Sequence, residues 1–327
     1  MAIVRYGIAG HPVDHSLSPL LTALVTAQLG LPWSEKQLKM ELVDATSLTD
    51  ALAWGYAGGI PTPVPWVYTG AVFGKFRTSA LLAKAVAGGL EETSPHPLLT
   101  PVTPVEPLEA PSVPGLPTRM FDEEIWMNLT SPLKHQLDSS AVVCIDDSMS
   151  TKSVNTLRWD GRGWWCAGLD GIGVLEVFRH HGVEPEASVL GVCGGGGGAR
   201  STASAWSKAG GRLHPLPSRR TLDEGPWTAA FTDAVPDAVV DFDGTHPSPA
   251  GAPLVLKAAY GVMEGDVDAR AKACTSPVLD GRWLLVSQHL ACWRTLWAPE
   301  RTSDLPSIEL LMTQLIKAEV VLASYAS

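Results

Sequence analysis

The sequence lacks the features of several protein classes. No apolar run approaches the ~20 residues that a membrane-spanning helix needs. Lys and Arg number 24 against 34 Asp and Glu, which gives a net charge of −10. The clustered basic surface that binds nucleic acid is therefore not expected. The apolar start of the chain, M-A-I-V-R-Y, lacks the basic region and cleavage site of a signal peptide, so we expect a cytoplasmic protein that binds neither membranes nor nucleic acid.

Cysteine is sparse and scattered. The chain has five cysteines, namely Cys144, Cys166, Cys193, Cys274 and Cys292. It contains no C-x-x-C pair and no His and Cys spacing typical of zinc sites, so no metal is expected. The simplest interpretation is free thiols in a reducing compartment, with Cys193 packing at the end of a strand.

The length and composition of the chain indicate a globular protein. Its 327 residues are enough for two ordinary domains, and 45% hydrophobic with 18% charged residues is a folded composition. The exception is 91–118, which holds eight prolines and cannot form a helix or an inner strand. We predict an insertion over about 55–124, with a short helix at 78–86 and then an extended connector. A proline-rich segment that binds a partner groove is the alternative.

The first strand-to-helix corner carries two serines. The stretch 4–10 predicts a strand, and Ser18 followed by Pro19 predicts an N-cap and the first helical position. Leucines at helical spacing follow, and Gly30 is placed to end the helix. Capping alone explains Ser18 but not Ser16, so a binding role for both hydroxyls stays open.

The second half of the chain alternates strands and helices. This rhythm predicts a parallel, doubly wound sheet, and a capped amphipathic helix is predicted after Pro306. The predicted elements are strand 189–193, helix 199–209, strand 212–216 and strand 238–242.

A glycine run lies between the first of these strands and its helix. Gly194, Gly196 and Ala199 match the G-x-G-x-x-A form of the dinucleotide fingerprint. Glycines let backbone N–H groups approach phosphate oxygens, and the helix N-terminus adds partial positive charge. The alternative is a merely flexible loop.

The residues after the next strand bear on the choice of cofactor. An acidic residue there would bind the ribose 2′-hydroxyl of NAD, but the chain reads Ser218, Arg219 and Arg220. Guanidinium groups suit a 2′-phosphate, so NADP is favoured. Two solvated surface arginines are the alternative.

A set of polar residues lies upstream of the glycine run. It comprises Asn128, Thr130, Lys134, Asn155 and Asp170. A lysine can transfer a proton to or from a substrate hydroxyl, and an aspartate can orient it. An isolated lysine would be interpreted as a surface residue, but the other polar residues of this set favour a catalytic role for Lys134.

Taken in order, these motifs resemble those of the shikimate dehydrogenase family, which includes quinate/shikimate dehydrogenases. The resemblance covers nearly the whole chain. The matching segments are H-S-L-S-P (15–19), N-L-T-S-P-L-K (128–134), S-V-N-T (153–156), G-L-D-G-I-G (168–173), G-G-G-G-G-A-R (194–200), S-R-R (218–220) and the glutamine of L-L-V-S-Q-H.

The resemblance implies a role for each motif. Substrate binding would fall to Ser16, Ser18, Asn128, Thr130, Asn155 and Gln288, and catalysis to Lys134 and Asp170. NADP would be bound by Gly194, Gly195, Gly196, Gly197, Gly198, Ala199, Arg200, Ser218, Arg219 and Arg220. The implied reaction is the reversible reduction of 3-dehydroshikimate to shikimate, with Lys134 as proton shuttle paired with Asp170.

The resemblance also implies an architecture. An N-terminal α/β substrate domain (1–165 and 286–327, with the insertion) would adjoin a Rossmann-type NADP domain (166–285), and the C-terminal helix would return to the first domain. The partner would be a small cyclic hydroxy acid, and the protein a monomer or homodimer.

Four departures keep the substrate open. The spacing from Ser18 to Asn128 exceeds the family's, and Leu169 occupies a position where threonine is usual. The tyrosine expected after the third Rossmann strand is missing, and His11 replaces a common asparagine. Loss of hydrogen-bonding groups would weaken binding of the usual polyol. Quinate or another hydroxy acid is therefore an alternative substrate, and a catalytically weak metabolite-binding paralogue is an alternative function.

Overall fold

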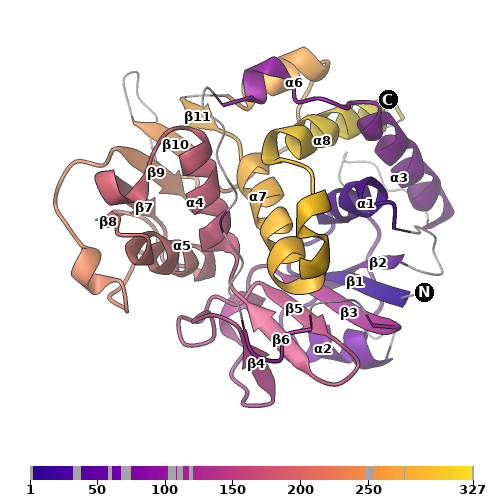
Figure 1. Ribbon diagram of the computed structural model, residues 1–327, viewed down its shortest axis with the longest axis horizontal. Helices are drawn as coiled ribbons and strands as arrows, with labels where there is room; N and C mark the ends of the chain where they lie inside the picture. Colours follow the sequence, from indigo (N-terminus) through magenta and orange to yellow (C-terminus); the bar gives the residue numbers. More distant parts are fainter. Residues whose placement is uncertain are drawn as a thin grey trace.

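Two sheets organise the chain, and each has its own helices (Figure 1). The computed structural model describes residues 3–31, 38–57, 61–67, 75–101, 108, 113–117, 121–246, 253–275 and 277–325. The strands of the first sheet are β1 (Ile3–Gly10), β2 (Leu38–Asp44), β3 (Glu123–Leu129), β4 (Val142–Cys144), β5 (Thr156–Trp159) and β6 (Trp164–Ala167). Those of the second are β7 (Val189–Cys193), β8 (Arg212–Leu216), β9 (Ala238–Asp241), β10 (Leu254–Lys257) and β11 (Val278–Leu279).

The helices cover both sheets. The longer ones are α1 (Ser18–Gln28), α2 (Leu48–Ala57), α3 (Lys75–Leu90), α4 (Asp170–His180), α5 (Gly197–Lys208), α6 (Val267–Ala273), α7 (Arg282–Cys292) and α8 (Ile308–Ala323). Short 3₁₀ helices occupy Pro97–Leu99, Leu133–His135, Pro185–Ala187, Thr228–Ala230 and Pro299–Asp304, and a π-helix follows α7 at Trp293–Trp297.

The first sheet is mixed and buried on both faces. Its strand order is β2-β1-β3-β5-β6-β4. Successive side chains of a strand point to opposite faces, so Trp126 packs in one core with Trp293 and Trp297, while Ile125 and Met127 pack in a second core. Helices α1, α7 and α8 belong to the first of these cores and α2 to the second.

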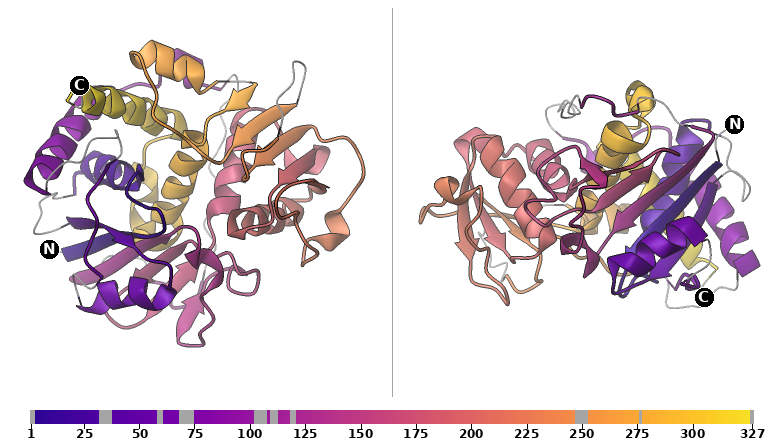
Figure 2. Two further views of the ribbon diagram at one scale, coloured as in Figure 1. Left: turned by 180° about the vertical axis from the view of Figure 1, so that it is seen from behind. Right: turned by 90° about the horizontal axis from the view of Figure 1, so that it is seen from below.

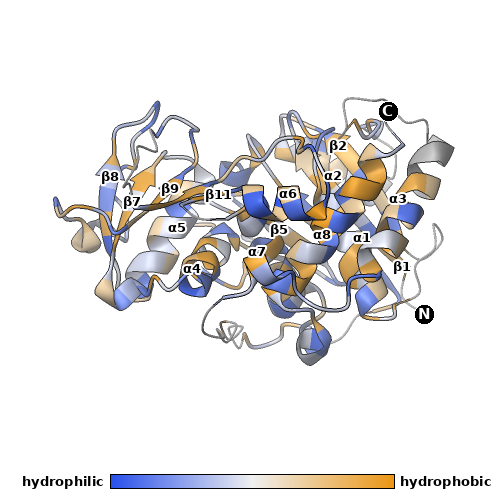
Figure 3. Cartoon of the chain, turned by 90° about the horizontal axis from the view of Figure 1, so that it is seen from above, coloured by the Kyte–Doolittle hydropathy of each residue, from blue (hydrophilic) through white to orange (hydrophobic). Residues whose placement is uncertain are grey.

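The second sheet is the predicted parallel, doubly wound sheet. Its order is β11-β10-β9-β7-β8, and every described pair is parallel. Figure 3 shows hydrophobic colour on the central strands β7 and β9 and hydrophilic colour on the edge strand β8, as expected for a sheet covered on both faces. The strands predicted at 189–193, 212–216 and 238–242 are confirmed, and the helix predicted from 199 begins two residues earlier, at Gly197.

Helices α4 and α7 lie side by side between the two sheets (Figures 1 and 2). The chain leaves the first sheet through β6 and α4 and returns through α7 to α8, which packs on α1 and α3. The predicted return of the C-terminal helix is thus confirmed. The predicted boundary at 165/166 falls within β6, and α7 begins four residues before the predicted return at 286.

The start of α1 differs from its prediction. The N-cap residue is Leu17, and Ser18 is already the first helical residue. The hydroxyl of Ser16 accepts a hydrogen bond from the backbone N–H of Ser18 at 3.2 Å. The prediction that Ser18 is the cap is therefore wrong, and it is Ser16 whose side chain bonds the backbone at this corner. The predicted stop at Gly30 is confirmed, because this residue has φ +61° just after the helix.

The region predicted as an insertion contains a packed helix. The predicted 78–86 helix runs from Lys75 to Leu90 as α3 and contributes Leu82 and Val86 to the core. A Cβ on Gly89 would lie 2.8 Å from the carbonyl oxygen of Gln314, so only glycine allows α3 to lie this close to α8.

The described part of the proline-rich segment is anchored on both halves of the molecule. The backbone N–H of His96 donates to Thr313 on α8 at 2.8 Å, and its ring nitrogen lies 2.8 Å from a carboxylate oxygen of Asp268 on α6. Leu99 is buried, and its carbonyl oxygen lies 3.0 Å from His180 on α4. The prediction of a solvated connector is wrong for His96 and Leu99, whereas most of the other residues at 91–100 are exposed. The remainder of the connector at 102–107, 109–112 and 118 lies outside the described residues.

Candidate functional site

Lys134 and Asp170 meet between the two sheets. Lys134 lies in the short helix after β3, and Asp170 is the first residue of α4. The Nζ of Lys134 is 2.5 Å from Oδ2 of Asp170. The lysine side chain is 22% exposed and the aspartate side chain 3% exposed. The sequence-predicted pair is therefore formed, and its ammonium group is the member that a ligand can reach.

Asn155 fixes the other oxygen of that carboxylate. Its amide nitrogen donates to Oδ1 of Asp170 at 2.9 Å. Its amide oxygen accepts from the backbone N–H of Leu169 at 2.8 Å and from the Thr156 hydroxyl at 3.0 Å. Both oxygens of Asp170 are thus held, which orients the carboxylate toward the lysine.

Asn128 extends the network into the first sheet. The Tyr6 hydroxyl donates to its amide oxygen at 2.7 Å. Its amide nitrogen lies 3.4 Å from both the Asn155 carbonyl oxygen and the Thr156 hydroxyl. Burial raises the pKa of Tyr6, so its phenol stays a proton donor. Thr130 follows at the end of β3, where its backbone N–H pairs with Ala9 of β1.

The two serines face elements from distant parts of the sequence. The hydroxyl of Ser18 lies 3.0 Å from Nε2 of His289 on α7, and both residues are buried. The phenol oxygen of Tyr260, in the loop after β10, accepts the backbone N–H of Leu17 at 3.1 Å. A tyrosine from the second sheet therefore reaches the serine turn. The chain has no tyrosine directly after the third strand of that sheet, and Tyr260 follows the fourth strand, in L-V-L-K-A-A-Y.

Gln288 precedes His289 on α7 and is half-buried. A Cβ on Gly173 of α4 would lie 3.0 Å from its backbone nitrogen. This close approach places the α7 segment carrying Gln288 directly against the helix that begins with Asp170.

Acid is expected to destabilise the fold through His289. Burial lowers the pKa of His289 to about 3, whereas histidine in an unfolded chain titrates near about 6.5. The unfolded chain binds a proton that the folded chain does not, so the free energy of unfolding falls as the pH drops below about 6.5. In urea titrations from about pH 7 to about pH 4, the His289→Gln variant should lose stability less steeply than the wild type. Equal slopes would contradict this assignment.

The glycine run forms the turn between β7 and α5. Gly194 has φ +123°, and Gly196 is the N-cap residue of α5. A Cβ on Gly195 would lie 2.5 Å from the carbonyl oxygen of Thr221, whereas one on Gly196 would meet nothing within 4 Å. The backbone at Gly196 is therefore open to a ligand at a helix N-terminus, which is the arrangement that binds phosphate.

This loop lies directly beside Lys134. A Cβ on Gly197 would lie 2.9 Å from Cβ of Lys134. Arg200 holds the loop in place through three carbonyl oxygens, those of Gly195 at 2.9 Å, Thr151 at 2.8 Å and Lys152 at 2.6 Å. Arg200, which was predicted to bind cofactor, thus fastens the glycine loop to the turn at 151–152.

The S-R-R segment follows β8 near the glycine loop. The Arg219 side chain is 77% exposed, and its guanidinium lies 3.5 Å from Asp243. Arg220 is exposed as well. Within the described residues, the buried Ser218 hydroxyl has no hydrogen-bond partner. One orphaned hydroxyl and two accessible guanidinium groups fit the binding of a phosphate monoester.

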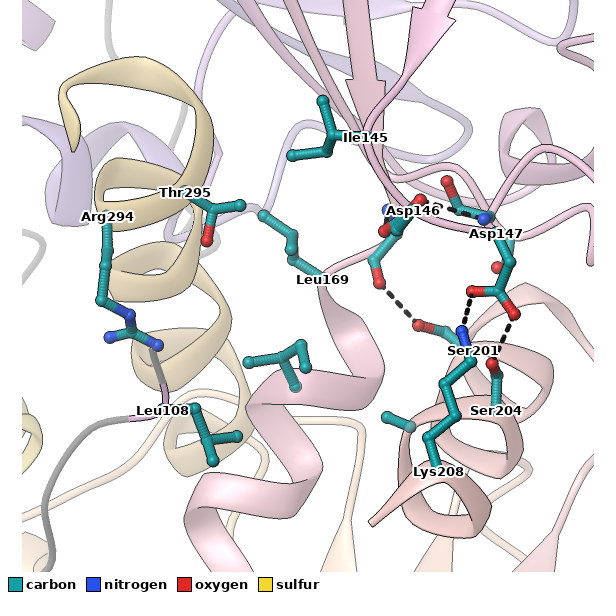
Figure 4. Close-up of a pocket in the computed structure, with 15 residues that line it drawn as sticks. Leu108, Ile145, Asp146, Asp147, Leu169, Ser201, Ser204, Lys208, Arg294 and Thr295 are labelled. Carbon is teal, nitrogen blue, oxygen red and sulfur yellow. Dashed lines mark hydrogen bonds and ion pairs between the residues drawn. The ribbon is translucent and has the colours of Figure 1, made fainter. Parts of the chain in front are cut away.

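Leu169 lines a small cavity. Its side chain lines a cavity of about 110 Å³ together with Ile145, Ile172 and Thr295 (Figure 4). Neither Lys134 nor Asp170 is among the residues that line it. Loss of a substrate-binding hydroxyl at Leu169, which the resemblance implies, stays a prediction.

The described ranges lack two other features. No helix in them is long and apolar enough to cross a membrane. No group of three or more His, Cys, Asp or Glu side chains in them could hold a metal ion.

Comparison with known proteins identifies the family. The chain is 30% identical over 204 residues to a protein named shikimate dehydrogenase (NADP(+)) from an Anaeromyxobacter species, across 53% of this chain and 73% of that protein. This chain belongs to the shikimate dehydrogenase family. A shikimate dehydrogenase (NADP(+)) from Methylibium petroleiphilum is 25% identical over 234 residues, or 71% of this chain and 54% of its own length. No family profile matches the chain.

Solved structures of shikimate dehydrogenases share the fold. The Thermus thermophilus enzyme, solved in complex with shikimate, has a TM-score of 0.55 at 19% identity and covers 97% of this chain and 100% of its own. A dehydroquinate dehydratase and shikimate dehydrogenase from S. pombe has a TM-score of 0.56 at 17% identity, over 97% of this chain and 53% of its own. The predicted α/β fold is thereby confirmed.

Proposed function

We propose that this family member reversibly reduces 3-dehydroshikimate to shikimate with NADPH. The main support is the close approach of Gly197 to Lys134. It places the glycine loop before α5 against the Lys134–Asp170 pair. A cofactor on that loop would lie beside the one accessible cation of the pair. The names of the relatives support both the cofactor and the reaction.

The cofactor residues fit a dinucleotide phosphate. The backbone of Gly195 and Gly196 would receive the pyrophosphate at the N-terminus of α5, and Ser218, Arg219 and Arg220 would receive the 2′-phosphate. When bound, the nicotinamide supplies the hydride that reduces the substrate carbonyl. Arg200 keeps the loop fastened to the 151–152 turn throughout.

Lys134 is the proposed proton donor in the direction of reduction. Its Nζ would give a proton to the carbonyl oxygen that becomes the new hydroxyl, and would take it back during oxidation. Asp170 would hold the ammonium group in position, and Asn155 would hold Asp170. In this role Asp170 and Asn155 are positioning residues, because their side-chain atoms already bind one another and Lys134.

The substrate would lie between the serine turn and the lysine. The proposed contacts are Ser16, Ser18, Thr130 and Gln288, with Asn128 and Asn155 shaping the polar wall behind them. The proton on Ser18 matters for an anionic substrate. If Nε2 of the neutral His289 donates to the Ser18 oxygen, the serine keeps its own O–H to donate to a carboxylate.

We further propose that the substrate is bound by 1–165 with 286–327 and NADP by 166–285. Each proposed subsite would then be built mainly by one sheet and its helices. A cytoplasmic location and a monomer or homodimer complete the proposal.

Absorbance of reduced nicotinamide during shikimate oxidation tests the function. Purified full-length protein is mixed with shikimate and NADP⁺, with quinate and NAD⁺ as parallel arms. Reduction of NADP⁺ by shikimate is expected. Activity with quinate alone would replace the proposed substrate, and silence in every arm would reject the proposed reaction.

A glycine pair in the loop separates cofactor binding from folding. Gly196→Ala should fold like the wild type, because the added methyl group meets open space. It should nevertheless weaken NADP⁺ binding by about tenfold or more, because the methyl group enters the space that the pyrophosphate approaches. Gly195→Ala is the contrast: its Cβ would clash with backbone, so thermal stability itself should fall. Unchanged NADP⁺ affinity in a folded Gly196→Ala protein would place the pyrophosphate elsewhere.

Arg219 should set the preference for NADP over NAD. A hydrogen bond to a charged group is worth about 1.5–3 kcal/mol, so Arg219→Ala should weaken NADP⁺ binding by roughly 10- to 100-fold. Affinity for NAD⁺, which lacks the 2′-phosphate, should change little. Calorimetric titration of both cofactors measures the ratio, and an equal loss for both would rule out recognition of the 2′-phosphate.

A further inference from the structure

Cys144 and Cys166 face each other at the edge of the first sheet. They are register partners on the parallel strands β4 and β6, with β4 as the edge strand. Neighbouring strands lie about 4.8 Å apart, and disulfides join Cα atoms separated by about 4.4–6.8 Å. Both side chains lie on the same face, in the core that contains Trp54 and Met127. The backbone therefore needs little movement to join the two sulfur atoms.

The two thiols differ in exposure. Cys144 is partly exposed, while Cys166 is fully buried behind it. The Sγ of Cys144 lies 3.3 Å from the Ser148 hydroxyl and 3.4 Å from Oδ1 of Asp146. An incoming molecule can reach only the outer sulfur, and the inner one is placed to attack whatever the outer sulfur receives.

The surroundings of Cys144 favour its thiolate. A hydrogen bond from the Cys166 thiol, with others from Ser148 and the backbone of Asp146, lowers the pKa of Cys144 to about 7. Burial and the Asp146 carboxylate act against this shift but are outweighed. The same contact and burial raise the pKa of Cys166. Cys144 is thus the member of the pair that both meets solvent and has the lowered pKa, as expected of an attacking thiol.

The other cysteines provide an internal comparison. Cys193, Cys274 and Cys292 are all buried, and burial raises the pKa of each. It reaches about 12 for Cys274 and about 12 for Cys292. These three side chains have the properties of inert packing residues.

We propose that Cys144 and Cys166 form a reactive dithiol site that small-molecule disulfides oxidise to an intramolecular disulfide. The Cys144 thiolate attacks one sulfur of a compound such as glutathione disulfide, forming a mixed disulfide and releasing one thiolate. Cys166 then loses its proton and attacks the Cys144 sulfur, releasing the second thiol. Two protein thiols are oxidised by two electrons, and one small disulfide is reduced to two thiols.

The site adjoins a turn that binds α5, the helix that follows the glycine run. Asp147, three residues after Cys144, binds Ser204 at 2.7 Å and Lys208 at 2.9 Å on α5. Asp146 accepts the backbone N–H of Gly168 at 2.8 Å, two residues before Asp170. A covalent change at Cys144 thus occurs two to three residues before side chains that bind α5 and the segment leading into α4.

Intact mass and peptide mapping of the full chain test the proposal. After incubation with glutathione disulfide at neutral pH, the wild type should lose about 2 Da and yield a linked Cys144–Cys166 peptide. Cys166→Ser should stop at one stable glutathione adduct on Cys144, Cys144→Ser should stay unmodified, and the control Cys274→Ser should behave as the wild type. A wild type that keeps all five thiols, accumulates an unresolved Cys144 adduct or reacts first at another cysteine would overturn it.

Discussion

Replacing Lys134 with alanine is expected to lower kcat for shikimate oxidation by about 10²- to 10⁴-fold, the usual contribution of general acid–base catalysis. The variant removes the only group of the Lys134–Asp170 pair that is accessible enough to meet a substrate. Binding of NADP⁺ should persist, because the glycine loop is held by Arg200 independently of the lysine side chain. Steady-state kinetics and calorimetric titration of the cofactor measure the two quantities.

Lys134→Met distinguishes charge from packing. Methionine keeps the aliphatic stem that lies beside Gly197 but lacks the ammonium group. It should lose as much turnover as alanine, whereas Lys39→Ala, at a half-buried ion pair with Glu41 on β2, should retain full activity. Substantial turnover in both Lys134 variants would assign the proton transfer to another group.

Arg158→Met should lower the free energy of unfolding by about 3–5 kcal/mol, the cost of breaking a buried ion pair. Arg158 on β5 and Glu124 on β3 have fully buried side chains. The guanidinium donates to the two carboxylate oxygens at 3.0 and 2.8 Å. Without it, a carboxylate stays in the core with its principal countercharge gone. Urea unfolding monitored by tryptophan fluorescence measures the loss.

The double variant Arg158→Met with Glu124→Leu tests the cause. Removing both charges should recover a large part of the stability, because no buried carboxylate is left behind. Recovery should be incomplete, since Arg158 also donates to the carbonyl oxygens of Pro117 and Leu296. If the double variant were as unstable as the two single losses added together, the destabilisation would arise from packing.

Local patterns carried much of the prediction. The glycine turn between β7 and α5 could be read from sequence because strand, turn and helix are contiguous. Lys134 and Asp170 could be paired because their motifs are short and ordered along the chain, and the structure brings them to 2.5 Å. In each case, a few neighbouring residues contain the information.

Contacts between distant segments could not be predicted this way. His289 meets Ser18 across 271 positions, and Tyr260 meets Leu17 across 243. Neither spacing leaves a periodic signal, because only the packing of α7 and the β10 loop against α1 brings them together. The cavity that Leu169 lines likewise depends on how α4 packs, which the motif alone does not specify.

The second sheet is an uninterrupted stretch of chain that enters through α4 and leaves through α7. For protein engineering it is an exchangeable cassette, bounded by the packed helices α4 and α7. Grafting a relative's cassette here would exchange the glycine loop and the S-R-R segment in one step. It would also exchange Tyr260, which reaches out of the cassette to the serine turn. Under the proposed function, the residues that set cofactor preference and the tyrosine beside the serine turn would therefore be exchanged together in any such chimera.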